Sequence, residues 1–125
     1  MTYPTVIVTA ANEPAARRIA DGLLRYGYGT FTATNEAEAL GILAAERRVG
    51  VLLGDVDAVG LDLARKARAL RPTLGIVYVS AAPQLIPNGA KLPGAPMLRT
   101  PYTPHQLASV ISGLGKRVLD DPLAA

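Results

Sequence analysis

The 125-residue sequence contains no cysteine and a single histidine, His105. Without cysteine the chain forms no disulfide, and it offers neither a cysteine nucleophile nor a thiolate ligand for zinc or an iron–sulfur cluster. One histidine cannot supply the groups of imidazoles found in many transition-metal sites. These absences exclude disulfide scaffolds, cysteine catalysis and histidine-cluster metal centres.

Long apolar runs and a strong charge of one sign are also missing. No stretch reaches the roughly 18 apolar residues of a membrane span, and residues 1–4 lack the positive flank of a secretory signal. The 13 basic and 10 acidic residues give a net charge of +3, far from the dense basic stripe of a nucleic-acid binder. We therefore expect a cytoplasmic protein that binds neither membranes nor nucleic acid.

Half of the residues are hydrophobic and 18% are charged, which indicates a packed core. The length fits one domain, and we expect a single domain over residues 1–125, with an ordered core over about 3–119 and a tail over 120–125. The sequence shows no glycine-rich phosphate loop and no nucleophile–base pair. We therefore do not expect an enzyme.

Short apolar runs alternate with alanine-rich stretches of helical spacing. The run over residues 49–56 is nearly continuous, as in a parallel strand that is covered on both faces. This alternation predicts an α/β fold with a parallel sheet, right-handed crossovers and helices on both faces. The predicted strands cover residues 5–9, 28–33, 49–56, 74–80 and 95–99.

Three polar residues mark the starts of predicted helices. Asn12 can cap a helix that has Pro14 in its first turn, and Asn35 with Glu38 resembles a capping box. Thr103 is followed by Pro104 and Gln106, which is a further helix start. The second helix is expected to run to about residue 48, and another helix is expected over residues 61–70.

Residues 81–94 break the alternation. This segment contains three prolines and two glycines, and one proline inside a helix costs about 3 kcal/mol. We therefore expect the helix between the fourth and fifth strands to be shortened or absent, with at most a short turn around Gln84 and Leu85.

Functional residues in parallel sheets gather at the carboxyl ends of the strands. Asp55 and Ser80 end the third and fourth predicted strands, and Thr100 and Pro101 follow the fifth. Residues 10–13 follow the first strand. These positions are where chemistry is expected.

The segments around these positions resemble, over nearly the whole chain, the receiver domain of response regulators in two-component signalling. Residues 6–8 with Asn12-Glu13-Pro14 resemble the first strand and acidic turn of that family, and residues 51–56 resemble the strand that ends in the phosphorylated aspartate. Residues 77–80 resemble the strand that ends in the switch Ser/Thr. Residues 98–104, Leu-Arg-Thr-Pro-Tyr-Thr-Pro, resemble the Leu-Pro-Lys-Pro-Tyr-Asp-Pro segment.

The resemblance implies a three-layer, doubly wound, flavodoxin-like fold of five parallel strands in the order 2-1-3-4-5. It implies that Asp55 is the phosphoacceptor candidate, that Ser80 is the switch hydroxyl, and that the Thr100–Pro101 bond is cis. In the family, an acidic pair binds Mg²⁺ and a lysine pairs with the phosphoryl group. The proline-broken segment resembles receivers attached to some hybrid histidine kinases.

The chain departs from the family at several of these positions. Ala11 and Asn12 occupy the acidic pair, and Thr100 occupies the lysine position. The loop that starts at Asp57 is shortened. We therefore expect Mg²⁺ to bind weakly, at Asn12 and Asp55, or not at all.

Several alternatives remain open for single residues. Asn12 either binds metal through its amide oxygen, with Glu13 or Asp57 compensating for the missing acid, or only caps a helix. Arg99 could replace the lysine, although alternation along a strand turns it away if Thr100 points inward. Ser80 either contacts a phosphoryl group or only ends a strand. We expect Tyr102 and Leu107 at an output face and His105 exposed to solvent.

These observations favour a degenerate, stand-alone receiver that acts through protein–protein contacts, with weak or no phosphorylation at Asp55. The expected partner is a histidine kinase, a phosphotransferase or another receiver, and the last helix with Tyr102 could form a homodimer. One alternative is a working phosphoacceptor. Another is a pseudo-receiver that senses a small molecule in the pocket between Ala11, Asp55 and Thr100.

Overall fold

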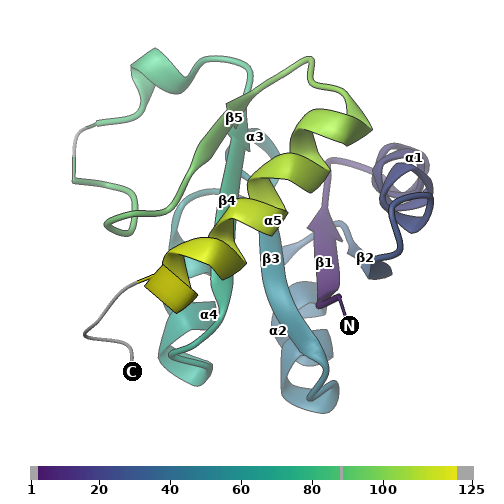
Figure 1. Ribbon diagram of the computed structural model, residues 1–125. Coiled ribbons are helices and arrows are strands. Elements are labelled where there is room, and N and C mark those ends of the chain that lie inside the picture. Colours follow the sequence, from purple (N-terminus) through teal and green to yellow (C-terminus); the bar gives the residue numbers. More distant parts are fainter. Residues whose placement is uncertain (1–2, 88, 121–125) are drawn as a thin grey trace.

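The computed structural model describes residues 3–87 and 89–120, and the side chains of residues 115–120 lie outside the described parts. The described residues form a five-stranded parallel sheet in the order β2-β1-β3-β4-β5 (Figure 1). This order and the flanking helices confirm the predicted fold class. The strands are β1 (Thr5–Thr9), β2 (Gly29–Ala33), β3 (Val49–Asp55), β4 (Gly75–Ser80) and β5 (Met97–Arg99).

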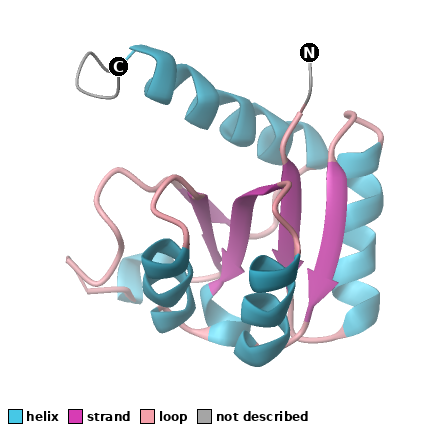
Figure 2. Cartoon of the chain, turned by 90° about the horizontal axis from the view of Figure 1, so that it is seen from below, coloured by secondary structure: helices cyan, strands magenta, loops and turns pink. Residues whose placement is uncertain are grey.

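Helices cover both faces of the sheet (Figure 2). The helices are α1 (Glu13–Leu24), α2 (Glu36–Ala45), α3 (Val56–Val59), α4 (Asp62–Leu70) and α5 (Pro104–Asp120), with a single 3₁₀ turn, η1 (Pro83–Leu85). None of these helices, within the described residues, is long and apolar enough to cross a lipid bilayer. The predicted tail over residues 121–125 lies outside the described residues.

Successive side chains of each strand point to opposite faces of the sheet, which divides the core into two parts. Val6 and Val8 of β1 face α1 and α5, whereas Ile7 between them faces α2 and α4. Leu53 and Leu52 of β3 divide in the same way. Burial of both faces explains why the central strands carry nearly continuous apolar runs.

The capping predictions are confirmed, with one difference in geometry. The Asn12 side chain accepts from the backbone N–H of Ala15 at 2.9 Å, and Thr103 and Gln106 satisfy each other's backbone N–H groups. Asn35 accepts from the N–H of Glu38 at 2.8 Å. The Glu38 carboxylate reaches past the cap residue to the N–H and hydroxyl of Thr34.

Several predicted element boundaries are wrong. The second helix ends at Ala45 rather than near residue 48, because Glu46 is already extended, with φ −112° and ψ 103°. Arg71, from the end of α4, donates to the carbonyl oxygens of Leu43 and Glu46 there. The third predicted strand stops at Asp55, because the chain turns directly into α3, a helix that was not predicted.

The segment between β4 and β5 contains no α-helix in its described residues, as its prolines predict. Only η1 forms, around Gln84 and Leu85. The Tyr78 hydroxyl accepts from the N–H of Leu92 at 3.0 Å, and Arg65 of α4 donates to the carbonyl oxygens of Gly89 and Ala90. Side chains of β4 and α4 therefore hold this segment in place.

Candidate functional site

The carboxyl edge of the sheet brings Asp55, Ser80 and Thr100 to neighbouring strand ends. Asp55 is positioned by a hydroxyl that sequence reasoning did not identify. Thr9, fully buried at the end of β1, donates to the carbonyl oxygen of Leu53 at 2.7 Å and accepts from the N–H of Asp55 at 2.8 Å. This bridge fixes the backbone of Asp55 to the central strand.

The Asp55 side chain is half-buried and caps α3. Its carboxylate accepts from the backbone N–H of Asp57 at 3.1 Å, which is the geometry of a helix N-cap. Burial raises the pKa of the Asp55 carboxyl, and the nearby Asp57 charge adds to the effect, while hydrogen bonds from the N–H groups of Ala58 and Asp57 lower it. No cationic side chain of the described residues forms an ion pair with Asp55.

Asp57 contacts the end of β4 through both of its carboxylate oxygens. Oδ1 accepts from the Ser80 hydroxyl at 3.1 Å, and Oδ2 accepts from the backbone N–H of Ala81 at 2.8 Å. The Ser80 hydroxyl in turn accepts from the N–H of Ala82 at 3.1 Å. Ser80 is 1% exposed, and its hydroxyl both donates and accepts a hydrogen bond within the chain.

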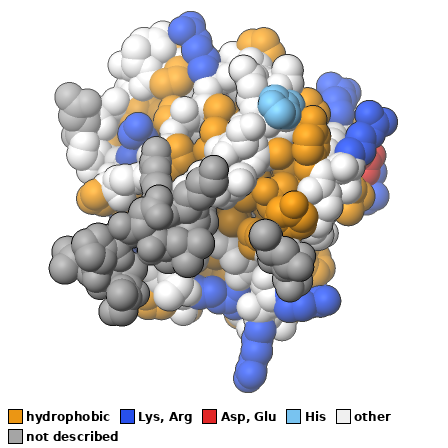
Figure 3. Space-filling view, in the orientation of Figure 1, with side chains coloured by type: hydrophobic (Ala, Val, Ile, Leu, Met, Phe, Trp, Pro, Cys, Tyr) orange, Lys and Arg blue, Asp and Glu red, His pale blue; other side chains and the backbone are white. Residues whose placement is uncertain are grey.

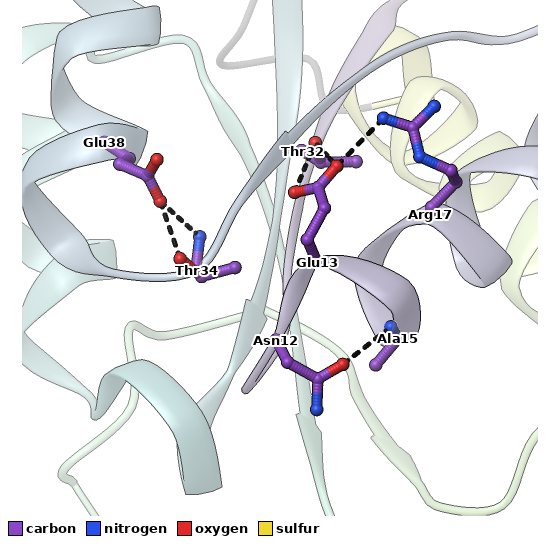
Figure 4. Close-up of polar contacts among 7 residues, drawn as sticks. All are labelled: Asn12, Glu13, Ala15, Arg17, Thr32, Thr34 and Glu38. Carbon is purple, nitrogen blue, oxygen red and sulfur yellow. Dashed lines mark hydrogen bonds and ion pairs between the residues drawn. The ribbon is translucent and has the colours of Figure 1, made fainter.

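The two polar residues after β1 point away from each other (Figure 4). The Asn12 amide oxygen caps α1 at Ala15. The Glu13 carboxylate instead accepts from the Thr32 hydroxyl of β2 and pairs with Arg17, at 3.1 Å and 3.0 Å. Glu13 is therefore held on the β2 side, and Asn12 has the helix-capping role that was one of its two predicted alternatives.

The residues around Asp55 do not fit a magnesium ion. A hard dication requires several anionic or carbonyl oxygens directed at one point. The oxygens of Asn12, Glu13 and Asp57 are engaged as described above, and no three acidic or histidine side chains in the described parts of the chain form a metal-binding group. The weak metal site predicted at Asn12 and Asp55 is thus not supported by this geometry.

A cavity of about 290 Å³ lies beside Asp55, between α1 and the start of α5. Thr100, Pro101 and Tyr102 line it, and the Thr100–Pro101 peptide bond is cis as the resemblance implies. Arg99 is exposed and is not one of the lining residues. Ala11, which was expected at this pocket, is also exposed and does not line it.

Tyr102 and Leu107 line this cavity rather than a flat outer surface. Leu107 is 1% exposed and belongs to the core between the sheet and α5, so it offers no surface to a partner in this structure. The Tyr102 hydroxyl is buried without a hydrogen-bond partner among the described residues. Burial, with a contribution from the Asp55 charge, raises the pKa of Tyr102 to about 12.

A second cavity of about 380 Å³ lies at the other end of the α1–α5 contact and is lined by aromatic residues. Tyr3, Tyr26 and Tyr28 surround it with His105, whose ring centroid lies 6.0 Å from that of Tyr26. His105 is exposed, as expected. Figure 3 shows hydrophobic side chains, in orange, gathered beside the histidine on this face.

Among the residues that build the site, the sequence did not indicate the roles of Thr9 and Asp57. Each of them bonds a residue that is more than 20 positions away in the chain. For Thr9, the one feature of the sequence that points to such a role is a polar side chain at the end of an apolar run. The sequence places Asp57 at the pocket and offers it as a compensating metal ligand, but it does not indicate the contacts of Asp57 with Ser80 and Ala81.

No protein-family model matches the sequence, and no curated protein is similar to it in sequence. Solved structures of receiver domains match its fold consistently. The chain resembles a response regulator receiver protein from Sinorhizobium medicae WSM419, with a TM-score of 0.76 and 24% identity over 90% of this chain and 94% of that one. A CheY-like receiver domain from Methylobacillus flagellatus gives a TM-score of 0.79 and 19% identity over 90% and 99%.

A third match is a response regulator from Burkholderia pseudomallei whose structure holds a phosphorylated aspartic acid, a calcium ion and citrate. Its TM-score is 0.74, with 22% identity over 96% of this chain and 74% of that one. The chain thus has the fold of response-regulator receiver domains, and the predicted resemblance is confirmed at the level of the fold.

Proposed function

We propose that this chain is a receiver-like signalling module of a two-component system, that it acts through contacts with other proteins, and that it does so without phosphorylation of Asp55. The observation that carries the proposal is the engagement of Ser80 and the Ala81 N–H by the Asp57 carboxylate. These are the donors at the carboxyl end of β4 that a phosphoryl group on Asp55 would need. A negatively charged group already occupies both.

The absence of cationic partners supports the same proposal. Transfer of a phosphoryl group to a carboxylate brings two anions together, and the transition state requires positive charge around the transferred oxygens. Thr100 provides a hydroxyl instead of an ammonium group, and no cation of the described residues pairs with Asp55. Asp57 adds a second negative charge nearby.

The proposed contact surface is the segment between β4 and β5 together with the exposed side of α5. Leu85 of η1 is 78% exposed, more than any other large hydrophobic side chain among the described residues. The contacts of Tyr78 and Arg65 hold the segment that follows η1 in one conformation. The partner expected at such a surface is a histidine kinase, a phosphotransferase, another receiver or a second copy of this chain.

The decisive experiment is intact-mass analysis after incubation with acetyl phosphate and Mg²⁺. The transfer would form a bond between a carboxylate oxygen of Asp55 and phosphorus and release acetate. We expect no mass gain in the parent protein, as in Asp55→Asn. A gain of one phosphoryl group in the parent but not in Asp55→Asn would overturn the proposal and establish a working phosphoacceptor.

A restored variant serves as the positive control. Ala11→Asp, Asn12→Asp and Thr100→Lys return the acids and the lysine to the positions where the family has them, and Asp57→Asn removes the negative charge that occupies the Ser80 and Ala81 donors. We expect this variant to gain one phosphoryl group that disappears when Asp55→Asn is added. Failure of the restored variant would show that the three missing groups and the Asp57 charge do not account for the absence of phosphorylation.

A further inference from the structure

Two residues that line the cavity beside Asp55 carry a polar group whose bonding is incomplete. One is the Asp55 carboxylate, which no cation of the described residues neutralises. The other is the Tyr102 hydroxyl, which is buried and has no hydrogen-bond partner among those residues. Buried polar groups in folded proteins are nearly always paired, so each exception calls for a physical explanation.

The walls of the cavity are mainly apolar. Ile19 of α1, Val79 of β4 and Leu107 of α5 face it, together with Pro101 and Pro104. Its volume of about 290 Å³ lies just below the range of about 300–1,000 Å³ that is typical of small-molecule sites. A ligand of one or two rings fits this volume, and the apolar walls favour an organic ring over a hydrated ion.

The cavity lies at the carboxyl ends of β3 and β4, where ligands of doubly wound sheets bind. We propose that it binds a small organic cation with a flat, mainly apolar body, such as an aromatic amidine or a protonated aromatic amine. The cationic group pairs with Asp55, and the ring lies between the apolar walls and against the Tyr102 side chain.

The charged residues around the cavity determine which ligand charge is favoured. Burial already disfavours the ionised form of Asp55, so an organic cation offsets the cost of keeping that carboxylate charged. An amidinium group also offers two parallel N–H donors that match the two carboxylate oxygens. Arg18, the one basic residue among those that line the cavity, is exposed, and it disfavours a ligand with more than one positive charge.

This inference extends the proposed function without depending on it, because ligand binding is measured in the absence of any phosphate donor. The test is an amide NMR titration of the full chain with three probes of similar shape: benzamidine, which is cationic, benzoate, which is anionic, and benzyl alcohol, which is neutral. We expect benzamidine to shift the amides of Asp55, Val79 and Tyr102 saturably. Its affinity should be at least about tenfold higher than that of benzoate.

Variants at two lining residues test whether benzamidine binds in the cavity beside Asp55. Asp55→Asn keeps the cap of α3, since Asn is as good a cap as Asp, and should abolish the preference for benzamidine over benzyl alcohol. Tyr102→Ala removes a ring that lines the cavity and should weaken benzamidine, whereas Tyr102→Phe keeps the ring and should retain the binding. Asp21→Asn, an exposed acid on α1, serves as the matched control and should bind as the parent does.

Three outcomes would overturn the inference. Benzoate could bind as tightly as benzamidine, or Asp55→Asn could leave the affinity for benzamidine unchanged. The shifts could also centre on the cavity lined by Tyr26 and His105, which would identify the aromatic cavity as the binding site. A failure of this kind leaves the phosphorylation experiment and its conclusion untouched.

Discussion

Asp57 makes the hydrogen bonds that connect the carboxyl ends of β3 and β4. Its carboxylate satisfies the Ser80 hydroxyl and the Ala81 N–H, and its own N–H is bound by Asp55. The strand ends β3 and β4 are thereby joined by a chain of hydrogen bonds that needs no ligand.

Removal of the Asp57 side chain should therefore destabilise the fold. In Asp57→Ala the buried Ser80 hydroxyl and the Ala81 N–H lose their acceptor, and we expect the free energy of unfolding to fall by about 1–2 kcal/mol. Urea denaturation followed by circular dichroism measures the change. The matched control is Asp21→Ala, an exposed acid without such contacts, which should change stability by less than about 0.5 kcal/mol. Equal effects of the two substitutions would show that the Asp57 contacts contribute nothing.

The buried Tyr102 hydroxyl makes stability depend on pH in the alkaline range. Its pKa is about 12 in the folded state against 10.0 for the unperturbed side chain, so the unfolded chain loses this proton first as pH rises. Above pH 10 the unfolded state binds fewer protons than the folded state, and stability decreases with pH until about pH 12. Below pH 10 the contribution of Tyr102 is constant.

We expect the parent to lose more stability between pH 10 and 12 than Tyr102→Phe does. Thermal unfolding of both proteins across this range measures the difference, and Tyr28, whose pKa is also raised by burial, is common to both. At neutral pH the variant should be at least as stable as the parent, because the removed hydroxyl has no partner in the folded state. Parallel pH profiles of the two proteins would contradict this assignment.

At the scale of elements, the sequence predicted what depends on local contacts. Asn12, Asn35 and Thr103 cap helices through bonds to backbone groups three residues away, and such spacing is visible in a sequence. The prolines of residues 81–94 excluded a helix for an equally local reason. Helix α3 was not predicted because four residues are too few to show a helical spacing of apolar side chains. Its N-cap is Asp55, which the family resemblance indicated as the phosphoacceptor candidate rather than as a cap.

The end of α2 depends on a contact from a distant element, which no local pattern reveals. The Arg71 guanidinium donates to the carbonyl oxygens of Val49, Leu43 and Glu46, at 2.6, 2.7 and 3.2 Å. It therefore joins the end of α2 and the start of β3 to the end of α4. The sequence indicated Arg71 only as the residue before a proline that closes a helix.

We expect Arg71→Ala to lower the free energy of unfolding by about 3 kcal/mol, because three carbonyl oxygens lose a charged donor at once. The stability of Arg71→Lys should lie between those of the parent and Arg71→Ala, since an ammonium group cannot donate to all three oxygens as the planar guanidinium does. Arg47→Ala, at an exposed position on the same connection, is the control and should have little effect. Chemical denaturation measures all three variants. A loss below about 0.5 kcal/mol in Arg71→Ala would mean that water replaces these bonds at no cost.

At the scale of the whole molecule, the distance between α1 and α5 determines the shape of the cavity beside Asp55. Both helices pack on the same face of the sheet, and both line the cavity. They approach closely at Gly22 of α1, where an added Cβ would lie 2.9 Å from Cγ of Pro104. The absence of a side chain at Gly22 thus allows the first turn of α5 to rest directly on α1.

We expect Gly22→Ala and Gly41→Ala to have opposite effects, although both substitutions fall inside helices. Alanine at Gly41 meets no atom within 4 Å and should stabilise α2 by about 0.5–1 kcal/mol, because it lowers the entropy of the unfolded chain. Alanine at Gly22 gains the same propensity but pushes α5 away from α1, and overpacking of this kind costs about 1–3 kcal/mol. Its net effect should be destabilising.

Urea denaturation gives both values, and the amide shifts of Thr100 and Tyr102 report whether the cavity has changed. In Gly22→Ala these shifts should move because the helices that line the cavity separate, whereas in Gly41→Ala they should stay in place. Stabilisation by both substitutions would show that the Pro104 ring moves aside without cost. The spacing of α1 and α5 would then be set by the apolar side chains of the core, and the cavity beside Asp55 would be deformable rather than fixed by this contact.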